Sequence, residues 1–181
     1  MKSVLISIKP KWCELIASGK KTIEVRKTKP KLKPPFKCYI YCTKDKNNHF
    51  WTGKRYSYAD DHSHNAFDKD GNGKVIGEFI CDRIDTIYII DDPVMTYIRV
   101  NQLNQHPDIC ITAETCLNIN QLQHYLNDKK GNGWHISDLK IYDMPKELSN
   151  FTGLRETKFG AEPVKITRPP QSWCYVEEVK K

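Results

Sequence analysis

The stretch GKKTIEVR, residues 19–26, decides how the first part of this chain folds. Upstream of it, Pro10 suits the first turn of a helix, and apolar residues follow at helical spacing up to residue 18. Gly19 is well placed as the left-handed residue that ends such a helix. The pattern therefore predicts a helix over residues 10–18 that stops at the quoted stretch.

The rest of the stretch, residues 21–26, alternates as a strand does. Ile23 and Val25 point to one face, which we expect in the core, whereas Glu24 and Arg26 point to the other. From the residues alone two interpretations are open. The charges form an exposed strand edge, or they form a polar pocket that Lys21 completes. Spacing by itself favours the structural alternative.

Further elements are predicted outward from this point. Strand character is found over residues 3–8, 36–42, 74–90, 133–144 and 172–179. A helix is predicted over residues 118–127, where Asn118 and Gln121 suit a capping box, and a second helical segment over about 93–105. Gly77 is a candidate for a β-bulge. Many short strands with few helices predict an α+β protein built on a small, partly open mixed β-barrel with flanking helices.

The basic residues of this chain are concentrated near its start. The 181 residues carry a net charge of +7, yet residues 9–37 alone hold ten Lys or Arg against two Glu, which gives 10 − 2 = +8. A local excess of this size favours a polyanionic partner, although a solvated lysine-rich loop and an acidic protein partner are alternatives. The length suggests a single domain over 1–181, with a long polar insertion at about 43–73.

Cysteine usage and hydropathy point to a cytoplasmic protein. Seven cysteines include no CxxC pair and form no disulfide framework, so free thiols are expected. No apolar run approaches the roughly 20 residues that a membrane span needs. We predict no membrane association, no metal and no cofactor, and the oligomeric state is left open.

The opening segment ISIKPKWCELIASGKKTIEVR resembles the ASCH domain, the ASC-1 homology domain of the PUA-like superfamily. The family hallmark is glycine, any residue, lysine, two residues, glutamate, any residue, arginine, and it falls here on Gly19, Lys21, Glu24 and Arg26. The later segments GWHISDLKIYD and RPPQSWCYVEE are similar to those of bacterial and phage members. The resemblance implies a PUA-like β-barrel with a cleft lined by the hallmark residues, and an association with RNA or nucleotide-like ligands.

The leading prediction is that the chain binds RNA or a nucleotide-like ligand through a basic cleft around the hallmark. The residues expected to bind it are Lys9, Trp12, Lys20, Lys21, Glu24 and Arg26. Lys21 and Arg26 would hold a phosphate or a base edge, and Glu24 would accept a hydrogen bond from an exocyclic amine.

The alternative is an enzyme, an RNase or an amidohydrolase acting on acylated cytidine-type nucleosides. One branch that resembles this domain hydrolyses the acetyl amide of N4-acetylcytidine with the hallmark lysine, a threonine three residues on and a later glutamate. Lys21 matches the lysine, Glu24 stands where the threonine would be, and Glu114 is the nearest counterpart of the glutamate. The catalytic candidates are therefore Lys21, Glu24 and Glu114. Because Glu24 replaces the threonine, binding is favoured over catalysis.

Two other features allow more than one interpretation. The insertion interleaves basic residues with Phe50, Trp51, Tyr56 and Tyr58, which could stack on bases or anchor the loop. DKDGNG, residues 68–73, resembles the start of an EF-hand loop, but Phe79 occupies its twelfth position, so a tight turn is predicted instead.

Histidines give weaker signals. His62 and His64 lie two apart in the insertion and are not expected to bind a metal. His135, beside Trp134, is expected to be a packed strand residue.

Overall fold

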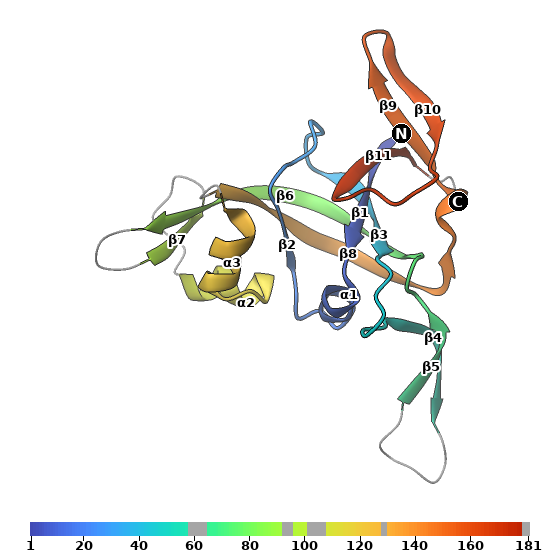
Figure 1. Ribbon diagram of the computed structural model, residues 1–181, viewed down its shortest axis with the longest axis horizontal. Helices are drawn as coiled ribbons and strands as arrows, with labels where there is room; N and C mark the ends of the chain where they lie inside the picture. Colours follow the sequence, from blue (N-terminus) through green and yellow to red (C-terminus); the bar gives the residue numbers. More distant parts are fainter. Residues whose placement is uncertain (58–64, 92–95, 101–107, 128–129, 179–181) are drawn as a thin grey trace. The chain divides into compact units, whose positions relative to one another are not determined.

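The structure is a computed structural model that describes residues 1–181 apart from 58–64, 92–95, 101–107, 128–129 and 179–181 (Figure 1). The chain forms two compact units. Unit 1 contains Met1–Glu14, Lys37–Phe79 and Asp138–Lys181, and unit 2 contains Leu15–Phe36 and Ile80–Ser137. The chain passes from one unit to the other within helix α1 (Pro10–Ala17), at the start of strand β3 (Phe36–Cys42), and within strands β6 (Val75–Asp91) and β8 (Lys130–Lys146).

Unit 1 is a mixed sheet. Besides parts of β6 and β8, its elements are β1 (Lys2–Ile8), β3 (Phe36–Cys42), β4 (Trp51–Ser57), β5 (Asn65–Asp70), the 3-10 helix η1 (Leu148–Asn150), β9 (Thr152–Thr157), β10 (Gly160–Lys165) and β11 (Trp173–Glu177). Hydrogen-bonded neighbours follow the order β10-β9-β11-β1-β3-β6. Strand β1 pairs parallel with β3 and antiparallel with β11, which confirms the predicted mixed sheet.

The core of unit 1 comes from residues that are far apart in the sequence. Leu5, Tyr39, Val75 and Phe151 are buried in one cluster. On β1, Leu5 shares its face with Ser3 and Ser7, and Val4, Ile6 and Ile8 lie on the other face, because alternate side chains of a strand share a face. Gly77 on β6 permits a close backbone approach, since a Cβ there would lie 2.5 Å from the carbonyl oxygen of Lys140 on β8.

The segment predicted as a long polar insertion contains a β-hairpin. Strands β4 and β5 pair antiparallel as a separate two-stranded sheet (Figure 1). Phe50 is buried, so it anchors the hairpin, and the Thr52 hydroxyl donates to the carbonyl of Tyr142 at 2.9 Å. The expectation of a stretch without regular structure was wrong for β4 and β5, because backbone pairing can form strands from polar sequences. Tyr58, His62 and His64 lie outside the described residues.

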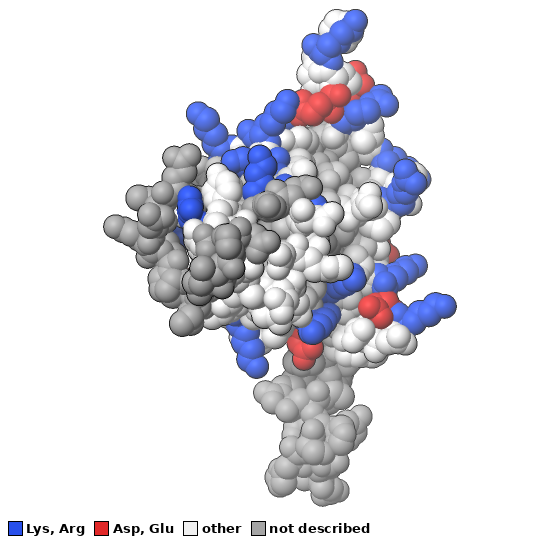
Figure 2. All heavy atoms as spheres, turned by 60° about the vertical axis from the view of Figure 1, so that its left-hand side comes forward, with Lys and Arg blue, Asp and Glu red and all other residues white. Residues whose placement is uncertain are grey.

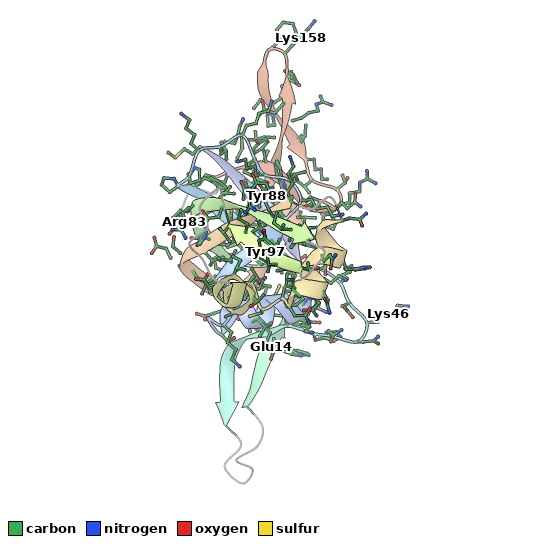
Figure 3. The ribbon with its side chains drawn as sticks, turned by 90° about the vertical axis from the view of Figure 1, so that its left-hand side faces the viewer. Glu14, Lys46, Arg83, Tyr88, Tyr97 and Lys158 are labelled. Atoms are coloured by element: carbon green, nitrogen blue, oxygen red, sulfur yellow. The ribbon has the colours of Figure 1, made fainter. Side chains whose placement is uncertain are left out.

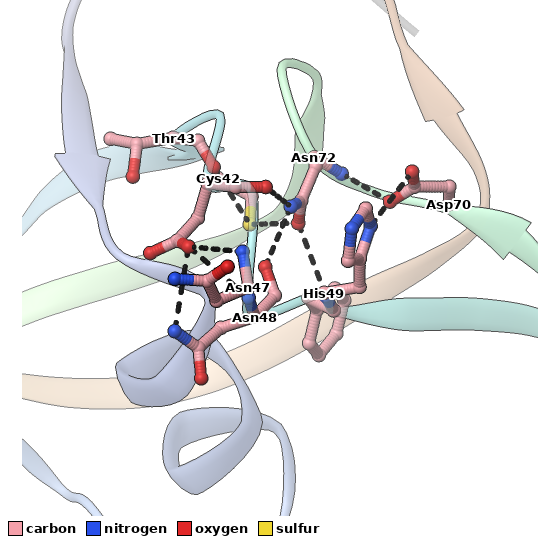
Figure 4. A network of polar contacts seen from close by, with 9 residues as sticks. Cys42, Thr43, Asn47, Asn48, His49, Asp70 and Asn72 are labelled. Atoms are coloured by element: carbon pink, nitrogen blue, oxygen red, sulfur yellow. Dashed lines mark hydrogen bonds and ion pairs between the residues drawn. The ribbon is translucent and has the colours of Figure 1, made fainter.

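A polar network shapes the turn at residues 68–73 (Figure 4). The Asn72 side chain accepts from the Phe50 N–H at 3.1 Å and donates to the carbonyl of Asn48 at 2.8 Å, and Asp70 accepts from the Asn72 N–H at 2.9 Å. Gly73 has φ +79°, the left-handed region that glycine tolerates. The side-chain oxygens of Asp70 and Asn72, which an EF-hand would turn towards calcium, therefore accept hydrogen bonds from backbone N–H groups. This agrees with the predicted tight turn.

Unit 2 packs two helices on one face of a sheet. Its remaining elements are β2 (Ile23–Arg26), β7 (Thr96–Val100), α2 (Asp108–Thr115) and α3 (Ile119–Leu126). Neighbouring strands follow the order β6-β8-β2, with β7 paired to β6. The core of this unit is formed by Ile23, Val25, Ile87, Ile89, Ile98, Val100, Ile111, Leu122 and Leu126.

Most elements of unit 2 agree with the expectations. Gly19 has φ +73° after α1, and Asn118 and Gln121 form both hydrogen bonds of a capping box on α3. The helix expected over about 93–105 was wrong at Thr96–Val100, which is strand β7, and residues 93–95 and 101–105 lie outside the described residues. The β-branched residues Ile98 and Val100 pack on the core from a strand, so tertiary contacts override the helical pattern.

Two statements about the whole chain remain at the level of prediction. No strand pairing among the described residues closes the sheet into a barrel, so the barrel stays a prediction. The single domain with an insertion is likewise untested. None of the helices in the described part of the chain is long and apolar enough to cross a membrane.

Candidate functional site

Strand β2 presents the hallmark residues. It pairs antiparallel with β8, so that Ile23 lies opposite His135 and Glu24 lies opposite Trp134. Ile23 and Val25 are buried in the core of unit 2, as the alternation predicts. Glu24 and Arg26 consequently lie on the other face of the sheet, together with Trp134.

Glu24 lies between two cations. One carboxylate oxygen is 3.4 Å from Nζ of Lys21, and the other is 3.0 Å from Nη1 of Arg26. The exposed fractions of the side chains are 2% for Lys21, 6% for Glu24 and 11% for Arg26, so the cluster is buried and Arg26 is its outermost member. Burial of charges is tolerated only where they are paired and hydrogen-bonded, and this arrangement meets that condition for Glu24.

Lys21 also joins β2 to the end of helix α2. Its Nζ donates to the carbonyl of Thr115 at 2.6 Å, and the N–H of Thr22 donates to the carbonyl of Glu114 at 2.9 Å. The last carbonyls of a helix lack partners within the helix and carry partial negative charge. A lysine ammonium at this position therefore stabilises α2 and fixes the turn before β2.

The structure separates Glu114 from the other two catalytic candidates. Lys21 and Glu24 are in contact, but Glu114 is exposed, and in the described part of the chain its carboxylate forms no hydrogen bond or ion pair with Lys21. Glu114 approaches the cluster through its backbone carbonyl alone.

An exposed basic rim, as we call the lysines that flank the cluster in the sequence, belongs to unit 2. It consists of Lys20, Lys27, Lys29, Lys31 and Lys33. Asn132 on β8 donates to the carbonyl of Lys27 at 3.1 Å, which holds the start of this loop against the sheet. Figure 2 shows that Lys and Arg (blue) outnumber Asp and Glu (red) on the face drawn.

The remaining predicted binding residues, Lys9 and Trp12, belong to unit 1. Lys9 is exposed, and Trp12 is half-buried at the start of α1. The Nζ of Lys11 lies 5.2 Å from the centre of the Trp12 ring. Their part in ligand binding stays a prediction.

A second polar cluster was missed by the sequence interpretation. Nε2 of His135 is 2.7 Å from Oδ2 of Asp85, and Nε of Arg83 is 3.2 Å from the same oxygen. His135 is therefore packed, as predicted, but it also takes part in this polar cluster. Asp85 lies on β6 and His135 lies on β8, so the contact becomes visible only when these two strands are seen to be neighbours.

No group of three or more His, Cys, Asp or Glu side chains in the described ranges is arranged to hold a metal ion. Two of the thiols are not activated either. Burial raises the pKa of Cys81 to about 12 and that of Cys174 to about 11.

Comparison with solved structures defines the class of fold. A crystal structure of an ASCH protein from Zymomonas mobilis superposes with a TM-score of 0.50 and 16% sequence identity, covering 97% of this chain and 88% of that one. A mutant of the same protein gives a TM-score of 0.49 and 16% identity over 98% and 92% of the two chains. At such identities the likeness concerns the fold, which is a mixed, sheet-dominated α+β fold with few helices.

A family model matches part of the sequence. The family model described as the ASCH domain matches residues 6–84, a range that includes the whole GKKTIEVR stretch. The predicted ASCH domain is thus confirmed for this part of the chain. No curated protein matches the chain.

Proposed function

We propose that this protein binds RNA or a nucleotide-like ligand through the surface around Lys21, Glu24 and Arg26. The observation that carries the proposal is the buried cluster in which one carboxylate lies between two cations. The three side chains have a formal charge of 2 − 1 = +1, so the cluster as a whole attracts an anionic group. A nucleic-acid-related function also agrees with the ASCH domain match.

Arg26 is the member suited to contact the ligand. Its side chain is the most exposed of the three, and guanidinium donors match the geometry of phosphate oxygens. Glu24 pairs with Nη1 of Arg26 and so fixes the orientation of the guanidinium. Lys21 is committed to Glu24 and to the end of α2, which makes the support rigid. The exposed rim lysines would draw a polyanion towards this point.

The amidohydrolase alternative needs Lys21 as a nucleophile or base and a glutamate to move the proton. Because Nζ of Lys21 is 2.6 Å from the Thr115 carbonyl and the Glu114 carboxylate is exposed, the geometry favours binding. The Lys21→Ala variant separates the two functions when RNA affinity and hydrolysis of an acylated cytidine are both measured. Turnover by the wild type that disappears in this variant would support the enzyme instead.

The binding proposal is tested on Arg26, whose replacement leaves the Lys21-Glu24 pair in place. The dissociation constant of a labelled single-stranded oligouridylate is measured by fluorescence anisotropy at low salt for the wild type and for Arg26→Gln. Loss of one charged phosphate contact should weaken binding several-fold, and it should lower the slope of log K against log salt by about 0.7.

The matched control is Arg155→Gln, which removes an arginine of unit 1 whose side chain is 69% exposed. It should change the affinity less than Arg26→Gln does. Equal effects of the two substitutions would show that only diffuse charge matters, and absence of binding by the wild type would refute the proposal.

A further inference from the structure

We infer that strands β6 and β7 carry a base-stacking surface, formed by Tyr88, Tyr97 and Arg99, for the nucleobases of single-stranded RNA. This inference rests on the proposed function and extends it from phosphate contacts to base contacts. It concerns residues of unit 2 that neither the hallmark nor the predicted site includes.

The register of the β6-β7 pair places the three side chains on one face. Tyr88 lies opposite Arg99, and Ile90 lies opposite Tyr97. Directly opposed residues of an antiparallel pair share a face, and so do residues two apart along a strand. The two tyrosines are therefore diagonal neighbours on adjacent strands, and Figure 3 shows both on the β6-β7 ribbon.

The opposite face of the same two strands is committed to the core. Ile87, Ile89, Ile98 and Val100 alternate with the tyrosines and pack in the cluster that includes residues of α2 and α3. Tyr88, Tyr97 and Arg99 thus point away from that core, and each is half-buried with part of its surface accessible. Two large aromatic rings in this position are not needed to fill the core of unit 2.

This face is also the one that carries the proposed phosphate contact. The bond between His135 and Asp85 places Asp85 on the Ile23 face, so Tyr88, three residues on, lies on the face of Glu24 and Arg26. Strands β2, β8, β6 and β7 are consecutive neighbours. Three steps between strands span about 14 Å, a distance that a short single strand can cross with its phosphates at β2 and its bases at β7.

Arg99 gives the surface its positive charge. Its Nη2 lies 3.5 Å from the Tyr97 hydroxyl, and its buried Nε has no hydrogen-bond partner among the described residues. Stacking on tyrosine combined with an arginine is the arrangement that single-strand binders use, and it is tolerant of base identity.

The test compares two probes with equal numbers of phosphates, an oligouridylate and an abasic oligonucleotide. Tyr88→Ala and Tyr97→Ala should each weaken binding of the oligouridylate about tenfold, the effect expected for loss of one stacked base, and leave binding of the abasic probe unchanged. Tyr88→Phe and Tyr97→Phe keep the ring and should retain the wild-type affinity. Phe159→Ala, which removes an 87% exposed aromatic side chain of unit 1, is the control and should change neither affinity.

The failures of the two proposals are distinguishable. If Arg26→Gln weakens binding but both tyrosine variants bind oligouridylate like the wild type, the stacking surface is wrong and the proposed function stands. If the alanine variants weaken both probes equally while urea unfolding shows lost stability, the tyrosines have a structural role and the inference is overturned. A wild type that binds neither probe refutes the proposed function itself.

Discussion

At the scale of single residues, Glu24 determines the character of the hallmark cluster. Its carboxylate is shared by Lys21 and Arg26, and all three groups are largely removed from water. Removing one partner of such a pair leaves an uncompensated buried charge, which costs more than the pair itself contributes. Glu24 therefore has a structural role in the site.

We expect Glu24→Gln to lower the free energy of unfolding by about 3–5 kcal/mol, because two buried cations lose their carboxylate. The measurement is urea unfolding followed by circular dichroism. Glu162→Gln is the matched control, since it breaks an exposed pair with Arg155 and should cost less than about 1 kcal/mol. Equal midpoints for the wild type and Glu24→Gln would contradict the buried ion-pair description.

At the scale of elements, helices α2 and α3 hold β2 in place from one face of the sheet. Ile111 of α2 and Leu122 of α3 pack in the same cluster as Ile23. The end of α2 supplies the Thr115 carbonyl to Lys21, so the helix and the hallmark stabilise one another. The position of Lys21 thus depends on an element some ninety residues away in the sequence.

The capping box of α3 tests how much the end of this helix contributes to stability. Asn118→Ala removes the acceptor of the Gln121 N–H and should cost about 0.5–2 kcal/mol in the free energy of unfolding. Thermal and urea denaturation measure it. Asn120→Ala replaces an exposed asparagine two residues further along the chain and should be close to neutral. A neutral Asn118 variant would mean that the cap does not support the helix.

At the scale of the whole molecule, charge is the property most relevant to a partner. The net charge is +7, and the segment 9–37 carries the excess. A partner held by phosphate contacts releases counterions when it binds, so its affinity depends on salt with a slope of about 0.7 per phosphate on single strands.

We expect oligouridylate affinity to fall steadily as salt rises, and the double variant Lys29→Gln/Lys31→Gln to show a smaller slope. Both lysines are exposed, so their replacement should leave stability unchanged. Anisotropy titrations over a series of salt concentrations provide the slopes. Identical slopes for the two proteins would remove this loop from the binding surface.

Local signals were sufficient where neighbours in the sequence make the structure. The left-handed Gly19 after α1, the alternation of Ile23 and Val25, and the capping box of Asn118 are all short-range features, and the structure has them. Helix α2 was missed because Asp108–Thr115 is rich in β-branched residues, whose helical preference is weak. The β9-β10 hairpin was missed because its second strand is mostly exposed and shows no apolar alternation.

The sequence by itself determined that Glu24 and Arg26 face away from the core, because a strand has a period of two residues. Only the tertiary structure decided what Lys21 contacts and which residues share the sheet face with the hallmark. Thr115, Tyr88 and Tyr97 reach their places through pairings and packing between segments far apart in the chain. Such long-range contacts depend on how whole elements pack, and no local pattern encodes them.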